Sequence, residues 1–156
     1  MSGSVIIGID PGVKTGFALL RDGKLLDCAA FQIHQAMRRV ELLHADGSLK
    51  LVVYEDARLR RWYGTKGVEA LQGAGSVKRD SSIWADFLAH LGCPVLALAP
   101  AKGMTKLDAK SFQRLTGWQW ASNEHGRDAA LLIWGRKLQK NARDPIEYMQ
   151  SLGRLL

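Results

Sequence analysis

The sequence predicts an α/β fold with a mixed five-stranded sheet, in which three antiparallel strands are followed by two parallel ones, and with helices on both faces. Three short apolar runs joined by tight turns open the chain, and helical and strand patterns alternate after them. No internal repeat, low-complexity tract or linker interrupts this order. The 156 residues, of which 47% are hydrophobic and 24% charged, predict one domain over residues 1–156.

The first three runs predict an antiparallel meander. Residues 5–9 are apolar and β-branched, and they end at Asp10-Pro11-Gly12. Residues 15–21 and 24–31 are strand-like, and Asp22-Gly23 stands between them. An Asp-Gly dipeptide between two such runs is typical of a two-residue hairpin turn.

The next two elements set the direction of the fourth strand. Residues 33–45 place Ile33, Met37 and Val40 at helical spacing, and residues 49–54 form another buried strand. Because strand–helix–strand crossovers are right-handed, strand 49–54 should lie parallel to strand 5–9, with both ending at the same edge of the sheet.

Helical patterns dominate the rest of the chain. The segments are a helix over 68–91 with a candidate break at Gly73-Ala74-Gly75, a strand over 94–99, a helix over 109–116 with Asp108 as its N-cap, a helix over 125–140, and a short terminal helix starting at Asp144-Pro145. We expect Trp84, Trp118, Trp120 and Trp134 to pack in the core.

Charge is unevenly distributed along the chain, which carries a formal net charge of +7. Residues 1–57 hold 6 basic and 7 acidic residues, residues 58–114 hold 10 and 4, and residues 115–156 hold 6 and 4. A concentrated basic segment indicates a polyanionic partner such as nucleic acid, although a solvated basic face has the same composition.

Cysteine usage and the N-terminus indicate a cytoplasmic protein. Cys28 and Cys93 stand alone among apolar residues, so they predict buried free thiols and neither a zinc site nor a disulfide framework. The N-terminus lacks a basic region and reaches Asp10 too soon for a signal peptide. The longest uncharged stretch is too short to span a membrane, so we expect no membrane partner.

Three carboxylates stand where predicted elements begin or end. Asp10 ends the first strand, Glu55 ends the strand beside it, and Asp128 lies in the first turn of the helix over 125–140. They converge if that helix packs across the same sheet edge. Converging carboxylates repel one another unless a cation neutralises them, and oxygen ligands suit Mg²⁺ or Mn²⁺. Two such ions per active site are the machinery of phosphodiester hydrolysis.

Each of these residues also suits a simpler role. Asp10 before Pro-Gly is typical of a turn residue. Asp56 can be a solvated residue or a helix cap, and Asp128 can be an acidic residue of the first turn that interacts favourably with the helix dipole. His125 lies three residues before Asp128 on the same helical face. The joint placement of the set at element ends favours a functional site.

At these positions the chain resembles the RuvC-type Holliday junction resolvases of the ribonuclease H-like superfamily. The motifs are I-I-G-I-D-P-G-V-K-T-G-F-A at 6–18, V-V-Y-E-D at 52–56, the helix at 73–91, A-P-A-K at 99–102, L-D-A-K at 107–110 and E-H-G-R-D-A-A-L-L-I at 124–133. They occur in the family's order over residues 5–138. The first motif is shared across the superfamily, whereas the ordered set is more specific.

The resemblance implies a ribonuclease H-like fold and a metal-dependent, structure-selective endonuclease that resolves four-way DNA junctions by paired phosphodiester hydrolysis. It implies that Asp10, Glu55 and Asp128 are metal ligands, and that His125 fills the fourth catalytic and metal-binding position. It also implies a homodimer. The basic segment after Glu55 and the compact chain depart from the family. They favour a phage-type member in a bacterial or phage-infected cell, with forks and flaps as further substrates.

Candidate contacts to nucleic acid concentrate in the basic middle of the chain. Arginines there can bind phosphates through two parallel hydrogen bonds. Trp62 or Tyr63 can stack on a base or wedge a branch point, or can anchor the loop to the core. Lys102 and Lys110 resemble phosphate-contacting lysines of the family, with Lys106 as an alternative. The full set is Arg58, Arg60, Arg61, Trp62, Tyr63, Lys66, Lys78, Arg79, Lys102, Lys106 and Lys110.

Three other functions stay open. One is a ribonuclease H-like nuclease that processes RNA, and a second is a non-catalytic nucleic-acid-binding module, which would not need four acidic-site residues. A third is an actin-like ATP-binding fold, whose phosphate loop also begins with Asp-x-Gly. That fold needs two such domains around its nucleotide, and 156 residues supply one.

Overall fold

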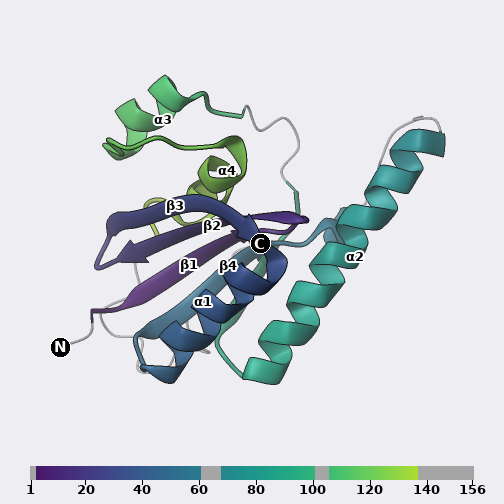
Figure 1. Ribbon diagram of the computed structural model, residues 1–156, viewed down its shortest axis with the longest axis horizontal. Helices are drawn as coiled ribbons and strands as arrows, with labels where there is room; N and C mark the ends of the chain where they lie inside the picture. Colours follow the sequence, from purple (N-terminus) through teal and green to yellow (C-terminus); the bar gives the residue numbers. More distant parts are fainter. Residues whose placement is uncertain (1–2, 61–67, 101–105, 137–156) are drawn as a thin grey trace.

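Five strands form one mixed sheet in the part of the chain that the computed structural model describes, residues 3–60, 68–100 and 106–136 (Figure 1). The strands are β1 (Val5–Asp10), β2 (Lys14–Arg21), β3 (Lys24–Gln32), β4 (Leu49–Glu55) and β5 (Val95–Leu98), in the order β3-β2-β1-β4-β5. β1, β2 and β3 pair antiparallel, whereas β4 is parallel to β1 and β5 is parallel to β4. The predicted sheet, including the direction of the fourth strand, is confirmed.

The turn between β2 and β3 has the geometry that its sequence predicts. Asp22 and Gly23 both have positive φ, at 50° and 83°. Positive φ at both central residues matches the right-handed twist of the flanking strands, and Asp and Gly are among the residues that tolerate it.

Helices cover both faces of the sheet, as predicted. The helices are α1 (Ile33–Ala45), α2 (Val68–Leu91), α3 (Ala109–Thr116) and α4 (Glu124–Ile133), and a single 3₁₀ turn, η1 (Ala57–Leu59), follows β4. α1 and α2 lie on one face, and α3 and α4 lie on the other (Figure 1). No helix in the described ranges is long and apolar enough to cross a membrane.

Each face of the sheet has its own hydrophobic core. Ile7 and Ile9 of β1 pack with Val40 of α1 and Trp84 of α2 in the first core. The second core lies beneath α4, and its members include Ile6, Cys28, Leu51, Val53, Phe112, Ala129 and Ile133. Cys28 and Cys93 are buried free thiols, as expected, and burial raises the pKa of each to about 11.

The tryptophan prediction is correct for three residues and wrong for one. Trp84 is fully buried, and Trp118 and Trp134 pack against the second core. Trp120, by contrast, is 68% exposed. It follows Gly117 in the loop that leaves α3, and its ring packs against Trp118 with centroids 4.8 Å apart, which leaves most of its surface exposed.

Two helix predictions need correction, and a third is confirmed. α4 begins at Glu124 and ends at Ile133, not at residue 140, because Gly135 has a φ of 77° and the chain leaves the helix there. Asp128 therefore lies in the second turn. α2 is continuous through Gly73 and Gly75. Asp108 caps α3 as predicted, accepting a hydrogen bond from the Ser111 amide. The predicted helix at Asp144-Pro145 lies outside the described residues.

Candidate active site

Strand alternation places Asp10 and Glu55 on the same face of the sheet. Ile6 of β1 and Val53 of β4 belong to the core beneath α4. Successive side chains of a strand point to opposite faces, so Asp10 and Glu55, an even number of residues further along, face α4 as well. Each is the last residue of its strand, and the two strands are parallel neighbours. The sheet therefore delivers two carboxylates to one edge, as predicted.

Three glycines let α4 approach this face closely. A methyl group on Gly8 would overlap the Ala129 carbonyl oxygen, and one on Gly16 would overlap the carbonyl oxygen of His125. A Cβ atom on Gly126 would lie 2.8 Å from the backbone nitrogen of Ala29. Glycine within a strand often marks such a close approach of another backbone. This contact seats the start of α4 directly above the end of β1.

His125 and Asp128 complete the group of four predicted residues. The Nδ1 atom of His125 lies 3.5 Å from Oδ2 of Asp10. Asp128 follows three residues later on α4, and its Oδ2 lies 3.7 Å from Nζ of Lys106. Lys106 also lies 3.7 Å from Oε2 of Glu124. The structure thus brings together residues from β1, β4 and α4, with one lysine beside them.

All four residues line a single cavity of about 330 Å³. Its polar wall consists of Asp10, Glu55, Lys106, His125 and Asp128, and its apolar wall consists of Pro11, Val77, Pro100, Leu131 and Leu132. The cavity contains more acidic than basic groups. It is a concave site at the carboxyl ends of two parallel strands, the usual position of sites in open α/β sheets.

The pKa values of two carboxyl groups in the cavity, those of Asp10 and Glu55, are raised. Burial, together with the charges of Glu55 and Asp128, raises the pKa of Asp10 to about 6, whereas His125 lowers it. Burial and the charge of Asp128 also raise the pKa of Glu55, and Lys106 and Arg60 lower it. Groups held in one site against their own repulsion are typical of a functional centre that binds a cation.

The donor set fits a hard divalent cation. It offers carboxylate oxygens from three residues and one imidazole nitrogen, which suit Mg²⁺ or Mn²⁺. Among the described residues, no three carboxylate, imidazole or thiolate groups lie close enough to form a ready-made metal site. The four side chains thus surround the cavity and do not meet at one point.

Asp56 points away from this site, toward α2. Its buried carboxylate accepts hydrogen bonds from Tyr54 Oη at 3.2 Å and from the Arg58 backbone amide at 3.0 Å, and it caps η1. It also forms an ion pair with the Arg58 guanidinium at 2.7 Å. These bonds lower the pKa of Asp56. The cap role is confirmed and the solvated alternative is wrong, because the residue after Glu55 necessarily faces the other side of the sheet.

Six of the eleven residues predicted to contact nucleic acid lie in the part of the chain that the structure describes. Arg58 binds Asp56, so a structural role is shown for it, and its contact with nucleic acid stays a prediction. Arg79 and Lys110 are exposed on α2 and α3. Lys106 lies in the cavity wall. Arg60 follows η1 and Lys78 lies on α2. Outside the described residues lie Arg61, Trp62, Tyr63, Lys66 and Lys102.

Sequence reasoning missed Glu124 and Arg127, which stand within the motif that predicts Asp128. Glu124 contacts Lys106 and lies 3.9 Å from Nε2 of His125. Arg127 donates from Nε to the Leu107 carbonyl oxygen at 2.9 Å and from Nη1 to the Ser122 carbonyl oxygen at 2.9 Å. It thereby ties the segment next to Lys106 to α4. The charged pattern of the motif signals both residues, but a pattern does not show their partners.

The sequence matches no protein-family model and no curated protein. The structure is similar to that of T. thermophilus RuvC in complex with a Holliday junction substrate, with a TM-score of 0.54 and 18% sequence identity. The similarity covers 83% of this chain and 90% of that chain. The strand order, the helices on both faces and this similarity together show that the chain has the RuvC-type ribonuclease H-like fold.

Proposed function

We propose that this chain is a metal-dependent endonuclease that hydrolyses phosphodiester bonds in branched DNA, with four-way junctions as its main substrate. One observation carries the proposal: Asp10, Glu55, His125 and Asp128 line a single cavity at the end of two parallel strands. The similarity in fold to a protein solved with a Holliday junction supports the choice of substrate.

The residues of the cavity have two proposed roles, metal binding and contact with a phosphate. Asp10, Glu55, His125 and Asp128 would hold Mg²⁺ or Mn²⁺, two ions per site. Such ions activate the attacking water and stabilise the leaving oxygen of a phosphodiester. Lys106 sits at the mouth of the site with 68% of its side chain exposed, where its ammonium group can contact a phosphate of the bound strand.

The distribution of charge supports a nucleic-acid substrate. The basic excess lies in residues 58–114, which include Lys106 and Lys110 on the side of the sheet that carries the cavity. We propose a homodimer in addition, because paired cuts across a four-way junction need two active sites.

A cleavage assay on matched substrates tests the proposal. A four-way junction, a fork, a linear duplex and an RNA stem are each incubated with the protein, with and without Mg²⁺. The expected result is Mg²⁺-dependent, symmetric nicking near the branch point of the junction, with little cleavage of the linear duplex. Asp10→Asn should abolish cleavage and retain junction binding. Asp86→Asn, at an exposed position of α2, is the matched control and should cleave normally.

Each alternative result has a clear meaning. Preferential cleavage of the RNA stem would favour an RNA-processing nuclease. Undiminished cleavage by Asp10→Asn would contradict the assignment of the cavity as the active site. Tight junction binding by the wild-type protein without cleavage in either Mg²⁺ or Mn²⁺ would favour a binding module.

A further inference from the structure

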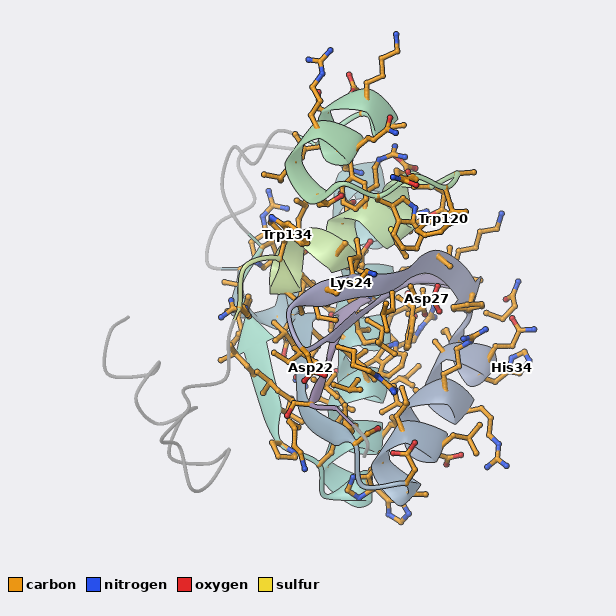
Figure 2. The ribbon with its side chains drawn as sticks, turned by 90° about the vertical axis from the view of Figure 1, so that its left-hand side faces the viewer. Asp22, Lys24, Asp27, His34, Trp120 and Trp134 are labelled. Carbon is orange, nitrogen blue, oxygen red and sulfur yellow. The ribbon has the colours of Figure 1, made fainter. Side chains whose placement is uncertain are left out.

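A pair of tryptophans, one of them exposed, stands just before α4, and neither lines the cavity. The rings of Trp118 and Trp120 lie with centroids 4.8 Å apart and planes at 60°. Trp118 packs against the second core, whereas Trp120 is 68% exposed. Figure 2 shows Trp120 and Trp134 near opposite ends of α4. An exposed tryptophan supported by a second, partly buried one is an unusual use of the largest apolar side chain.

Trp118, the inner member of the pair, is held in place by short-range hydrogen bonds. The Trp118 backbone amide donates to Thr116 Oγ1 at 3.2 Å, and its indole Nε1 donates to the Ala121 carbonyl oxygen at 3.4 Å. Thr116 Oγ1 itself donates to the Phe112 carbonyl oxygen at 2.8 Å. Trp118 is therefore fixed between the end of α3 and the loop, so Trp120 rests on a preorganised support, and ordering it on binding should cost little free energy.

The segment that carries the pair is basic, and it leads into α4, which supplies two of the polar residues that line the proposed catalytic cavity. The segment 109–123, which lies between Asp108 and Glu124, contains Lys110 and Arg114 and no acidic residue, and both cations are exposed on α3. His125 lies five positions after Trp120 in the chain, so their Cα atoms are at most about 18 Å apart. Exposed cations and an exposed aromatic ring on one segment are the combination that binds single-stranded nucleic acid, through phosphates and base stacking.

We propose that Trp120, supported by Trp118, is a stacking platform for an unpaired nucleobase of the bound nucleic acid. The proposal rests on the proposed nuclease function only for the identity of the substrate. We favour nucleic acid over a protein partner because Lys110 and Arg114 are exposed on the same segment, and such cations bind an anionic phosphate backbone. The platform would receive a base displaced where a branched substrate opens.

Binding measurements with unpaired and paired probes test the platform. Fluorescein-labelled oligo-dT and a fully paired hairpin are titrated with wild-type protein, Trp120→Ala, Trp120→Phe and Leu42→Ala in EDTA, where metal-dependent cleavage cannot occur. Leu42 is 53% exposed on α1, on the other face of the sheet, and is the matched control. Trp120→Ala should weaken oligo-dT binding by about 5- to 150-fold and leave hairpin binding unchanged. Trp120→Phe should retain most of the affinity, and Leu42→Ala all of it.

Three outcomes would overturn the platform. Unchanged oligo-dT binding by Trp120→Ala is the first, and an equal loss on the paired hairpin, which indicates a general phosphate contact, is the second. The third is a smaller assembly of Trp120→Ala in gel filtration, which would place Trp120 in a protein interface.

The two proposals fail separately. Trp120-dependent oligo-dT binding without any metal-dependent cleavage leaves the platform standing and removes the nuclease. Junction cleavage together with oligo-dT binding that does not depend on Trp120 supports the nuclease and removes the platform.

Discussion

The carbonyl oxygen of His125 lies so close to Gly16 that a single methyl group on Gly16 would overlap it. This contact joins β2 to the start of α4 and sets the distance between His125 and Asp10. Glycine at this position is thus a condition for the candidate active site, although Gly16 carries no chemical group that could take part in a reaction.

We expect Gly16→Ala to destabilise the protein by about 1–3 kcal/mol, the usual cost of adding a methyl group to a packed position. Gly73→Ala is the control, because Gly73 lies in α2 with open space around it. There the same change should stabilise the protein by about 0.5–1 kcal/mol through helix propensity. Urea unfolding of both variants measures the difference, and equal effects would show that α4 can shift without cost.

The raised pKa of Asp10 predicts how the metal-free protein responds to pH. With a pKa of about 6 against an ordinary value of 3.8, the folded state keeps a proton that the unfolded chain releases. This contribution to the free energy of unfolding therefore falls as the pH rises from about 4 to about 6. Above that range Asp10→Asn should be more stable than the wild type, by at most about 3 kcal/mol.

Urea unfolding in EDTA at several pH values measures this effect. Asp86→Asn is the control and should follow the wild-type pH dependence. Mg²⁺ should stabilise the wild-type protein above pH 6 and have a smaller effect on Asp10→Asn, because ligand binding to the folded state adds to stability. If the wild-type protein is as stable at pH 7 as Asp10→Asn, then the negative charge of Asp10 does not destabilise the folded state.

The ion pair between Arg58 and the buried Asp56 predicts a second stability effect. Arg58→Ala leaves a buried carboxylate without its main partner, and it should destabilise by about 1–3 kcal/mol, less than a fully buried pair because Arg58 is 40% exposed. Arg38→Ala is the control, since Arg38 and Glu41 form an exposed pair, and should change stability by less than about 0.5 kcal/mol.

The pH dependence of this effect identifies its origin. The lowered pKa of Asp56 means that its contribution is present above the ordinary value of 3.8 and is lost as the pH falls through the lower, folded-state pKa. The difference between wild type and Arg58→Ala should therefore shrink in acid. A difference that stays constant down to pH 2 would assign the effect to packing of the Arg58 side chain.

Lys106 competes with a cation for the acidic side of the cavity. Its Nζ lies 3.7 Å from both Asp128 and Glu124, so Lys106→Met should strengthen Mn²⁺ binding by up to about fivefold, the range of an exposed ion pair. Lys110→Met on α3 is the control. Calorimetric titration with Mn²⁺ measures both, and weaker binding by Lys106→Met would show that Lys106 supports the metal site.

The proposed homodimer gives a direct hydrodynamic prediction. Light scattering coupled to gel filtration should give twice the mass of the 156-residue chain at micromolar concentration. A monomeric protein that nevertheless makes paired cuts would contradict the proposal that two active sites in one dimer are needed.

Local patterns sufficed for most of the fold because they act within a few residues. The Asp22-Gly23 turn, the Asp108 cap and the apolar β1 each follow from neighbouring side chains. The end of α4 was missed because apolar spacing continues past Ile133, whereas the left-handed conformation at Gly135 ends the helix. Trp120 was misplaced because composition favours burial of tryptophan, and only the course of the loop leaves it exposed.

The sequence by itself determined which four residues form the candidate site, since strand ends and a helical i, i+3 spacing are local properties. Only the tertiary structure decided how these residues are arranged around one cavity. Gly8, Gly16 and Gly126 admit the backbone of α4 to the sheet, and strand alternation sends Glu55 into the cavity and Asp56 into its pair with Arg58. Distances between elements depend on packing across the sheet, and no pattern along one element contains that information.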